Sequence, residues 1–577
     1  MSQRLQTINL TDFTGGVNTT RSDFQLKANE SPGMLNMEVD PFGGFYTRPG
    51  WARWNPSDIV TSPVTNWRPR NAQLHPYSNG TFSVFITNAN KVWAGGPNAT
   101  FVDLGAVCGA VPHLADPAAW GNVVYLACGR GNPCWKVTNQ PAAGNLGAAI
   151  AAAGSANWNN NYTTPVRGVM PKCEHLEPHG GYIFAANTQE DSIVYPNRVR
   201  WSHTDEPEDW ALNDYIDIEQ GGGAITAIRS YNDHLLIFKI DSVWALFGYD
   251  ADSWQLVKVS ASVGTPSPTA VTRSEDSIYF FSSTGRNGIY AYSGQAPQDI
   301  SRNQRWVLDN LANGIDIWLS WMGRRLWCSL PWEWEPGGTT SSHGSLLVYD
   351  PEHQAWIRHK PAHGTIACTV EYSDVAAEYP LVVTCGCVGV AGVLAVERQP
   401  DIAGDILVQA QPAVGYQCRY RTSWQDAGWP ERQKSFLRPR YIARVLPSSV
   451  TIRVSTFWNY NPNSERRSHV YSVTAGGGSF WRADGFEDLK GGGFDFGDGL
   501  PDGEHPERPL AMWGAGVNER SGDVLVRPGV ANPASRGASL GWAKAVQLEF
   551  SPNDHTLALP WGVDAIVLKV NLRELTT

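Results

Sequence analysis

The segment AITAIRSYNDHLLIFKIDSVWALFG, residues 224–248, decides the fold class. It holds three apolar segments rich in Ile, Leu, Val and aromatic residues, separated by polar residues at Asn232–Asp233 and at Asp241. Short apolar runs between turn residues are typical of consecutive antiparallel strands. The same arrangement recurs between about residues 65 and 400 at roughly 40-residue spacing, the length of one propeller blade. We therefore predict an all-β protein in which residues 61–405 form a β-propeller of six or seven blades.

Tryptophan marks the ends of several of these units. Trp210 follows EPED, Trp254 follows DADS and Trp356 follows PEHQA, and the first two are 44 residues apart. A Trp side chain at this place would fill the gap between neighbouring blades and bury a large area. A ring built in this way leaves few sheet edges exposed.

Composition limits the possible classes of protein. The 577 residues are enough for two to four domains, and 25 Trp and 57 Gly favour short strands joined by turns. The net charge of -10 argues against general affinity for nucleic acid, which needs a basic surface. It does not argue against nucleic acid passing through a pore, because an acidic wall would repel phosphate.

The cysteines and the longest apolar run indicate where the chain folds. Nine cysteines are an odd number, irregularly spaced and without a CxxC pair, so we expect reduced and mostly buried thiols in a protein folded in a cytoplasm. The polar start, residues 1–12, predicts no signal peptide. The run at residues 381–396 is too short to span a membrane and contains Gly, so it predicts two buried strands and no membrane span.

The two ends of the chain differ from the repeats. Residues 1–60 are expected to form an extended N-terminal arm that supplies a closing strand, with one short helical turn capped by Ser31. Residues 406–577 are expected to form a C-terminal β-sandwich or barrel, from which the Gly/Asp-rich segment 476–536 projects. Aromatic residues of the arm are expected to anchor an interface, unless they pack on their own propeller. They are Phe42, Phe45, Tyr46, Trp51 and Trp54.

One polar segment, YPNRVRWSHTDEPEDW at residues 195–210, is a candidate for catalysis. A Ser–His–acid site needs its members brought together in a defined geometry, whereas neighbours in a strand point to opposite faces. The pattern therefore favours a polar turn anchored by Trp201 and Trp210 over an active site. The candidate catalytic side chains are Ser202, His203, Asp205, Glu206, Glu208 and Asp209.

Three places could hold a metal ion. Cys173, His175 and His179 could bind zinc with a fourth ligand from elsewhere, although Pro178 and the glycines that follow favour an ordinary turn. His359 and His363 have HxxxH spacing, but the intervening Pro361 and the missing Glu argue against a zinc-binding helix. Acidic oxygens on the Gly-rich loop 491–504 would suit calcium, and the alternative is a solvated tip. These acids are Asp495, Asp498, Asp502 and Glu504.

The one basic cluster is ERQKSFLRPRYIAR, residues 431–444. It could contact phosphate or the acids of a partner, and it is explained more simply as a strand whose charged side faces a neighbouring subunit or water. The chain has no phosphate-binding GxxxxGK[ST] loop, no GxSxG and no dinucleotide fingerprint. We therefore predict that the chain is not an enzyme, and we assign it no catalytic residues, no cofactor and no metal ligands.

The N-terminal segment FTGGVNTTRSDFQLKANESPGMLNMEVDPFGGFYTRPGW, residues 13–51, resembles that of many tailed-phage virion proteins. Those run GG-N, then N-E-S/A-P, then L-N-x-x-V/D, then a Gly turn and R-x-G. NRVRWSHTDEPEDW with the segment after it, and the segment from VGTPSP to ISR, are similar to later parts of the same proteins. The resemblance extends over roughly residues 10–305.

The family comprises the tail nozzle, tail-tube and head-completion (DNA-stabilising) proteins of short-tailed bacteriophages. The resemblance implies a structural virion protein, most simply the nozzle or hub subunit of the tail. It implies a β-propeller with appended β domains, and a ring homo-oligomer, expected to be a hexamer. It implies contacts with adaptor and portal-side tail proteins and tail fibres, and a channel that retains and then conducts DNA. We further expect the wall of that channel to be acidic.

Two other interpretations of the sequence stay open. A fibre-adaptor or receptor-binding tail protein would be trimeric and would bind surface glycan of the host. A carbohydrate-active or carbohydrate-binding propeller would use tryptophan for sugar stacking and paired carboxylates for cleavage.

Overall fold

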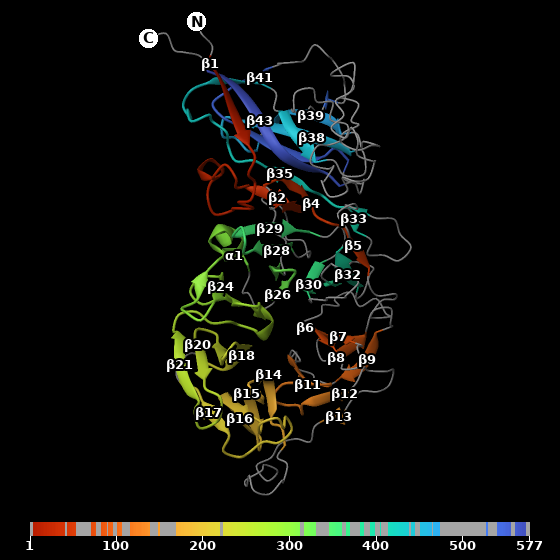
Figure 1. Cartoon of the computed structure of the whole chain (residues 1–577), viewed down its shortest axis with the longest axis vertical. Helices are drawn as coiled ribbons and strands as arrows, with labels where there is room; N and C mark the ends of the chain where they lie inside the picture. Colours follow the sequence, from red (N-terminus) through yellow and green to blue (C-terminus); the bar gives the residue numbers. More distant parts are fainter. Residues whose placement is uncertain are drawn as a thin grey trace, which may run out of the picture.

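The computed structural model describes most of the chain and defines its architecture (Figure 1). The described residues are 4–40, 43–53, 71–76, 82–88, 91–95, 101–106, 116–138, 148–149, 169–219, 223–311, 317–330, 345–360, 365–369, 381–385, 393–397, 404–405, 414–437, 440–444, 450–463, 465–473, 527–528, 539–554 and 560–572. Nearly all regular structure in these residues is antiparallel strand, and the α-helix α1 (Arg305–Asp309) is a single short turn.

Seven four-stranded antiparallel sheets make up the larger part of the described residues. The first two consist of β6 (Asn71–Pro76), β7 (Phe82–Asn88), β8 (Lys91–Gly95) and β9 (Val102–Ala106), then β10 (Asp116–Trp120), β11 (Val123–Ala127), β12 (Trp135–Thr138) and β13 (Ala148–Ala149). The third and fourth consist of β14 (Lys172–His179), β15 (Tyr182–Glu190), β16 (Ile193–Trp201) and β17 (Tyr215–Asp217), then β18 (Ile225–Tyr231), β19 (His234–Lys239), β20 (Val243–Phe247) and β21 (Gln255–Ser260). The fifth and sixth consist of β22 (Val271–Arg273), β23 (Ile278–Ser282), β24 (Gly288–Tyr292) and β25 (Gln298–Asp299), then β26 (Trp318–Met322), β27 (Arg325–Leu330), β28 (Ser345–Asp350) and β29 (Ala355–His359). The seventh consists of β30 (Thr365–Thr369), β31 (Leu381–Cys385), β32 (Val393–Glu397) and β5 (Trp51–Arg53).

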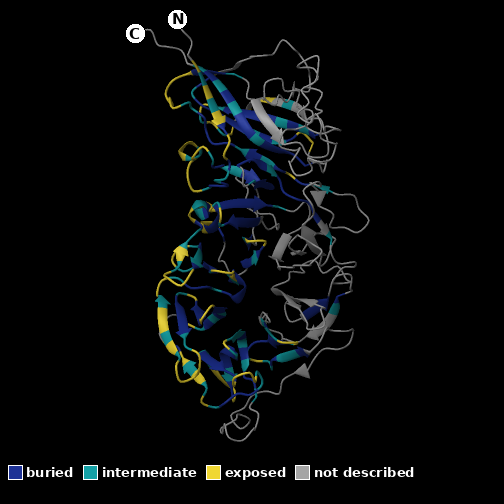
Figure 2. Cartoon of the chain, in the orientation of Figure 1, coloured by how far each residue is buried: buried dark blue, intermediate teal, exposed yellow. Residues whose placement is uncertain are grey.

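These sheets are arranged around a common centre, which confirms the predicted β-propeller fold (Figure 1). The first strand of each sheet contacts the first strand of the next, and β30 of the seventh sheet contacts β6 of the first, so the ring closes. Burial falls from the inner to the outer strands (Figure 2). In the fourth sheet every residue of β19 is buried, whereas β21 is partly or fully exposed along its length.

Tryptophan side chains fill the spaces between neighbouring sheets, as the repeat predicted. Trp210 is 1% exposed and packs among residues of the second and third sheets. Trp254 packs against Trp201 between the third and fourth sheets, with ring centroids 4.3 Å apart. Trp356 is 1% exposed between the fifth and sixth sheets, and its Nε1 donates to the Ile300 carbonyl at 3.1 Å. A few large side chains thus supply much of the apolar area buried between sheets.

Two further sheets lie at one end of the propeller, near both ends of the chain (Figure 1). The seven-stranded sheet contains β1 (Arg4–Leu10), β3 (Met37–Val39), β4 (Phe45–Thr47), β36 (Lys434–Leu437), β37 (Arg440–Arg444), β41 (Ser539–Ala543) and β43 (Gly562–Leu572). The six-stranded sheet contains β2 (Gly33–Leu35), β35 (Arg419–Arg421), β38 (Val450–Trp458), β39 (Glu465–Val473), β40 (Arg527–Pro528) and β42 (Val546–Pro552). A two-stranded ladder of β33 (Gly404–Asp405) and β34 (Val414–Gly415) completes the described strands. We call the two larger sheets the terminal sheets.

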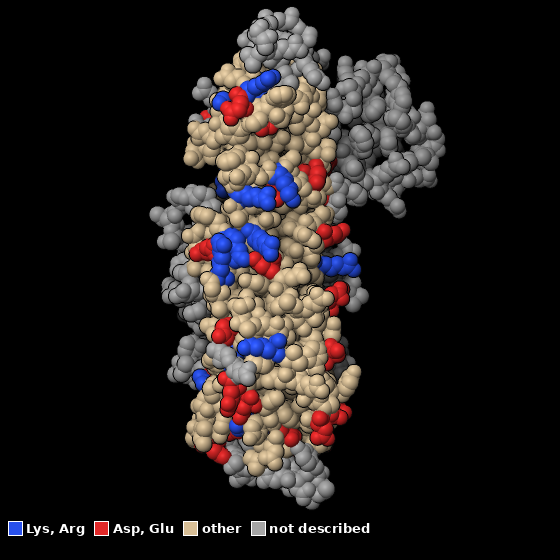
Figure 3. Space-filling view, turned by 90° about the vertical axis from the view of Figure 1, so that its left-hand side faces the viewer, with Lys and Arg blue, Asp and Glu red and all other residues tan. Residues whose placement is uncertain are grey.

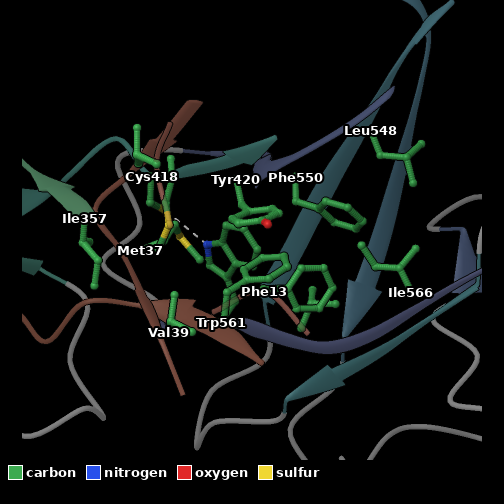
Figure 4. Packing of buried hydrophobic residues seen from close by; sticks show 14 of the residues in the cluster. Phe13, Met37, Val39, Ile357, Cys418, Tyr420, Leu548, Phe550, Trp561 and Ile566 are labelled. Atoms are coloured by element: carbon green, nitrogen blue, oxygen red, sulfur yellow. Dashed lines mark hydrogen bonds between the residues drawn. The ribbon is translucent and has the colours of Figure 1, made fainter. Parts of the chain in front are cut away.

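One hydrophobic core joins the terminal sheets to the propeller (Figure 4). Phe45 stacks on Tyr420 with ring centroids 4.0 Å apart, and Trp561 Nε1 donates to Cys418 Sγ at 3.2 Å. Ile357 of β29 reaches this core from the sixth propeller sheet. The propeller and the terminal sheets therefore share buried side chains.

The N-terminal segment differs from the extended arm that we expected. Its strands β1, β3 and β4 lie in the seven-stranded sheet and β2 lies in the six-stranded sheet, while β5 is the outer strand of the seventh propeller sheet. The helical turn predicted at Ser31 is wrong, because the Ser31 hydroxyl donates to the Arg421 carbonyl at 2.7 Å and a strand follows at Gly33. A short 3-10 turn, η1, occurs instead at Asp23–Gln25.

The expected aromatic anchors are largely part of the core. Phe45 and Trp51 are fully buried within the same chain and Tyr46 is half-buried, so an interface role for the first two is wrong. Phe42 and Trp54 lie outside the described residues. The loop 491–504 and His363 lie outside them as well, as does all of the segment 476–536 except β40. In the part of the chain that the structure describes, no helix is long and apolar enough to cross a membrane.

The packing of Trp210 generates a first prediction. Trp210→Ala should lower the free energy of unfolding by about 3–5 kcal/mol, because it removes a fully buried side chain and leaves a cavity between two sheets. Trp429→Ala is the matched control, since this Trp is 46% exposed and its loss should cost less than about 1 kcal/mol. Urea unfolding followed by fluorescence measures both, and equal shifts for the two variants would contradict the role of Trp210.

Candidate functional site

The polar segment 195–210 forms a turn held by hydrogen bonds to the backbone and by two buried tryptophans. The Ser202 hydroxyl accepts from the Ile183 backbone N–H at 3.0 Å and donates to the His203 carbonyl at 3.0 Å, so its bonds go to the backbone. Trp210 Nε1 donates to the Pro207 carbonyl at 3.0 Å, and the rings of Trp201 and Trp210 are buried. The tryptophan-anchored turn favoured by the sequence is therefore what the chain forms.

The acids of this turn serve different purposes. Glu208 accepts hydrogen bonds from Lys136 Nζ at 2.8 Å and from the Tyr125 hydroxyl at 3.1 Å, and both partners belong to the second sheet. Asp205 is exposed, and its N–H donates to the Gly181 carbonyl at 2.8 Å. The turn thus connects the third sheet to the second without bringing an acid onto the Ser202 hydroxyl.

The strand before this turn carries an ionic network that the sequence analysis did not identify. Arg198 donates to Glu190 at 2.9 Å and to Asp217 at 2.8 Å, and Arg200 also donates to Glu190. The guanidinium of Arg198 lies 3.7 Å from the ring centroid of Tyr195. These bonds fasten β16 to β15 and β17. The signal in the sequence that could have identified this network is the pair of alternate Arg residues in NRVRW, because alternate residues of a strand point to one face.

Two of the three candidate zinc ligands on β14 have different partners, and the third, His175, is buried in the same strand. Cys173 lies with its sulfur 3.6 Å from Cys134 Sγ, whereas His179 Nδ1 is 2.8 Å from the Ser230 hydroxyl of the fourth sheet. His359 lies in strand β29 rather than in a helix. Among the described residues no group of three His, Cys, Asp or Glu side chains is placed to hold a metal ion.

A polar cluster at the ends of β14 and β18 was also missed. His179 lies near His234, whose Nδ1 is 2.8 Å from Asp233 and whose Nε2 is 3.0 Å from the Tyr292 hydroxyl. Burial, the nearby His234 and Arg273 lower the pKa of His179, so its ring stays neutral at pH 7. These contacts connect the third, fourth and fifth sheets through hydrogen bonds.

The most heavily cross-braced polar site lies between the propeller and the terminal sheets, and we call it the junction. At its centre Arg48 is fully buried, with its guanidinium 3.9 Å from the ring centroids of both Trp51 and Tyr416. Arg48 Nε donates to Asn36 Oδ1 at 3.0 Å, and Nη1 donates to the Pro49 carbonyl at 2.9 Å. A planar guanidinium suits this position, because it stacks on rings while its edge donates.

Asn36 connects three parts of the chain at the junction. Its Nδ2 donates to the Gln417 carbonyl at 2.6 Å, and its Oδ1 also accepts from the Lys360 backbone N–H at 2.7 Å. Its own N–H donates to the Arg358 carbonyl at 2.8 Å. Asn36 has a φ of 53°, a left-handed conformation that Asn tolerates better than most residues. The N-terminal segment, the sixth propeller sheet and the start of β35 therefore meet at one side chain.

The paired glycines near the N-terminus allow the chain to approach β29 closely. Gly16 has a φ of +61°, and a Cβ there would lie 2.5 Å from the Trp356 carbonyl oxygen. The next residue, Val17, donates its N–H to that oxygen at 2.7 Å, and its carbonyl accepts from Gln304 Nε2 at 2.6 Å. Only glycine fits at residue 16, so the GG-N motif has a packing role.

A buried charge cluster completes the junction. Glu38 accepts hydrogen bonds from Arg325 Nη1 and from the Tyr46 hydroxyl, both at 3.2 Å, and the Glu38 carboxylate raises the pKa of Arg325. His359 is 0% exposed, its Nε2 lies 3.7 Å from Glu38, and neither ring nitrogen has a hydrogen-bond partner in the described part of the chain. Burial, helped by the cations Arg48 and Arg325, lowers the pKa of His359 well below its ordinary 6.5.

Some solved β-propeller structures are similar to the chain at low sequence identity. No family model matches the chain, and no curated protein is similar to it. Similar solved structures include the WD40 β-propeller domain of Doa1 (7% identity, TM-score 0.33, 61% of this chain and 98% of that one) and the Neurospora crassa Pan2 WD40 domain (9%, 0.33, 61% and 96%). Another is virginiamycin B lyase from Staphylococcus aureus (14%, 0.28, 57% and 96%). The chain is a β-propeller with two further sheets formed by its ends.

The junction generates a second prediction. Arg48→Ala should lower the free energy of unfolding by about 3 kcal/mol or more, because it leaves buried acceptors without a donor and removes two ring contacts. Arg48→Lys should recover less than half of the loss, since an ammonium cannot stack and donate in the same way. Thermal unfolding measures the series, with Arg302→Ala as control because that side chain is 81% exposed. Full rescue by lysine would contradict the geometric role.

His359 generates a third prediction, on pH. The folded chain keeps His359 neutral, whereas the unfolded chain protonates it near its ordinary pKa of 6.5. Its contribution to stability is therefore present above pH 6.5 and is lost as the pH falls below it, by at most about 1.4 kcal/mol per pH unit. In His359→Leu the unfolding midpoint should fall less between pH 7.5 and 5.5 than in the parent chain. An unchanged slope would exclude His359 as a source of the acid sensitivity.

Proposed function

We propose that this chain is a structural subunit of a bacteriophage tail, most simply the nozzle or hub, that assembles into a ring around a DNA channel. The observation that carries the proposal is the overlap between the resemblance and the junction. The N-terminal motif residues that resemble tailed-phage proteins include Gly16, Asn36 and Arg48, which hold the propeller to the terminal sheets. A motif with this role serves to position two parts of a subunit rather than to catalyse a reaction.

The shape of the subunit agrees with the proposal. A propeller braced by tryptophan and joined to the terminal sheets through a shared core is a stiff elongated body. Copies of such a body can form a closed ring through one repeated heterologous contact. Adaptor and portal-side tail proteins would bind one end of the ring and tail fibres its outside, and DNA would pass through the centre.

Surface charge is relevant to how such copies meet. On one flank of the molecule Lys and Arg gather near the middle, and Asp and Glu lie mainly below them and along one edge (Figure 3). Around α1 the basic side chains Arg286 and Arg305 are paired with Asp309 and Asp299, and the 81% exposed Arg302 lies 3.9 Å from Asp299. A flank of mixed sign suits a protein–protein contact, and an acidic channel wall stays a prediction for the assembled ring.

The fourth prediction concerns the number of copies in the assembled protein, which its mass reports. The full-length chain, purified at increasing concentration and studied by native mass spectrometry and electron microscopy, should form a closed ring of six copies. A trimer that binds host glycan would favour a fibre-adaptor or receptor-binding protein. A monomer that cleaves polysaccharide would overturn the structural proposal. In either outcome the propeller fold would be unaffected, since it does not depend on the assembly.

A further inference from the structure

A pair of thiols lies between two propeller sheets. Cys134 comes directly before β12 of the second sheet, and Cys173 lies in β14 of the third. Their sulfur atoms are 3.6 Å apart, and the two residues are 1% and 0% exposed. A disulfide bond needs a sulfur separation of about 2.0 Å, so a small movement of the side chains would bring the sulfurs to bonding distance.

The backbone on both sides of the pair is held in place. The Cys173 carbonyl accepts from the Gly129 N–H at 3.0 Å, which connects β14 to the turn after β11. Cys134 Sγ lies 3.4 Å from the Pro171 carbonyl, on the segment that leads into β14. Trp210 packs in the same core and shields the pair from solvent. The two thiols therefore meet because the sheets bring them together, although 39 residues separate them in sequence.

We propose that Cys134 and Cys173 form a latent disulfide site that a small-molecule disulfide oxidises, joining the second and third propeller sheets covalently. This inference is independent of the proposed function. One cysteine thiolate attacks a sulfur of the small disulfide, which gives a mixed disulfide and releases one thiolate. The second cysteine thiolate then attacks the protein sulfur of the mixed disulfide and releases the other. Two electrons pass to the reagent, and the two protons lost by the cysteines are taken up by the released thiolates.

Other buried cysteines provide a contrast. Cys418 accepts a hydrogen bond from Trp561, and burial raises the pKa of its thiol to about 12. Cys328 is fully buried in the sixth sheet, and burial raises the pKa of its thiol as well. Thiols of high pKa are poor partners for exchange. We therefore expect the reaction to be specific to the pair between the second and third sheets.

The test uses the purified full-length chain after complete reduction. Oxidised glutathione is added over a series of urea concentrations up to the start of unfolding, because local opening is needed for the reagent to reach a buried pair. Remaining thiols are then alkylated, and digested peptides are mapped by mass spectrometry. The expected product is a pair of peptides joined through Cys134 and Cys173. Its mass should be lower by two hydrogen atoms than the sum of the two reduced peptides, and dithiothreitol should separate the pair into the reduced peptides again. The oxidised chain should also unfold at a higher temperature than the reduced chain.

Matched variants separate this result from general oxidation. Cys134→Ser should lose both the cross-link and the rise in unfolding temperature, while its hydroxyl can still donate to the Pro171 carbonyl. Cys328→Ser should keep both. The proposal is overturned if Cys134 and Cys173 are alkylated or separately glutathionylated without forming a cross-link, or if neither thiol reacts at any urea concentration below unfolding. It is also overturned if Cys173 pairs instead with Cys128, the buried cysteine directly after β11.

Discussion

The structure depends on the pairing of β5 with β32, which completes the seventh propeller sheet. Without β5 that sheet would have three strands, and the backbone groups of β32 would form an unpaired sheet edge. The missing strand comes from residues 51–53, more than 300 positions before its partner at residues 395–397. The start of the chain must therefore return to the end of the propeller. Once there, its other strands have only the terminal sheets to pair with, which is where β1 to β4 lie.

The same constraint explains why the junction is so heavily hydrogen-bonded. The chain passes from the terminal sheets into the propeller at Arg48–Trp51, where strands of two different sheets come within a few residues of each other. Backbone N–H and C=O groups at such a crossing cannot join the hydrogen bonds of either sheet, so side chains must form hydrogen bonds with them. Arg48 and Asn36 do this for Pro49, Lys360 and Gln417. Arg48 and Asn36 are therefore residues that the topology makes difficult to replace.

The propeller could be predicted from sequence because its signals are local. The three strands of residues 224–248, their turns and the Trp at three of the sheet boundaries all lie within about one repeat of 40 residues. A closing strand from the N-terminal segment was expected from the sequence, whereas the pairing of β2, β3 and β4 with distant strands was not, since each has only three residues. Ser31 followed by Pro32 fits a helix start locally, and only the distant Arg421 carbonyl shows that the hydroxyl is used elsewhere. At residues 195–210 the sequence favoured a turn anchored by tryptophan, but nothing in the segment indicates that Glu208 bonds Lys136.

The buried charges at the junction restrict the angle between the propeller and the terminal sheets. An apolar interface tolerates small shifts, because dispersion attraction that weakens at one place is recovered at another. Arg48, Glu38 and Arg325 have no such freedom, since a shift that breaks one of their bonds leaves a buried charge without its partner. We interpret the junction as the feature that sets one relative orientation of the two bodies. A ring closes only if every copy has the same shape, so a fixed orientation is what a ring-forming subunit requires.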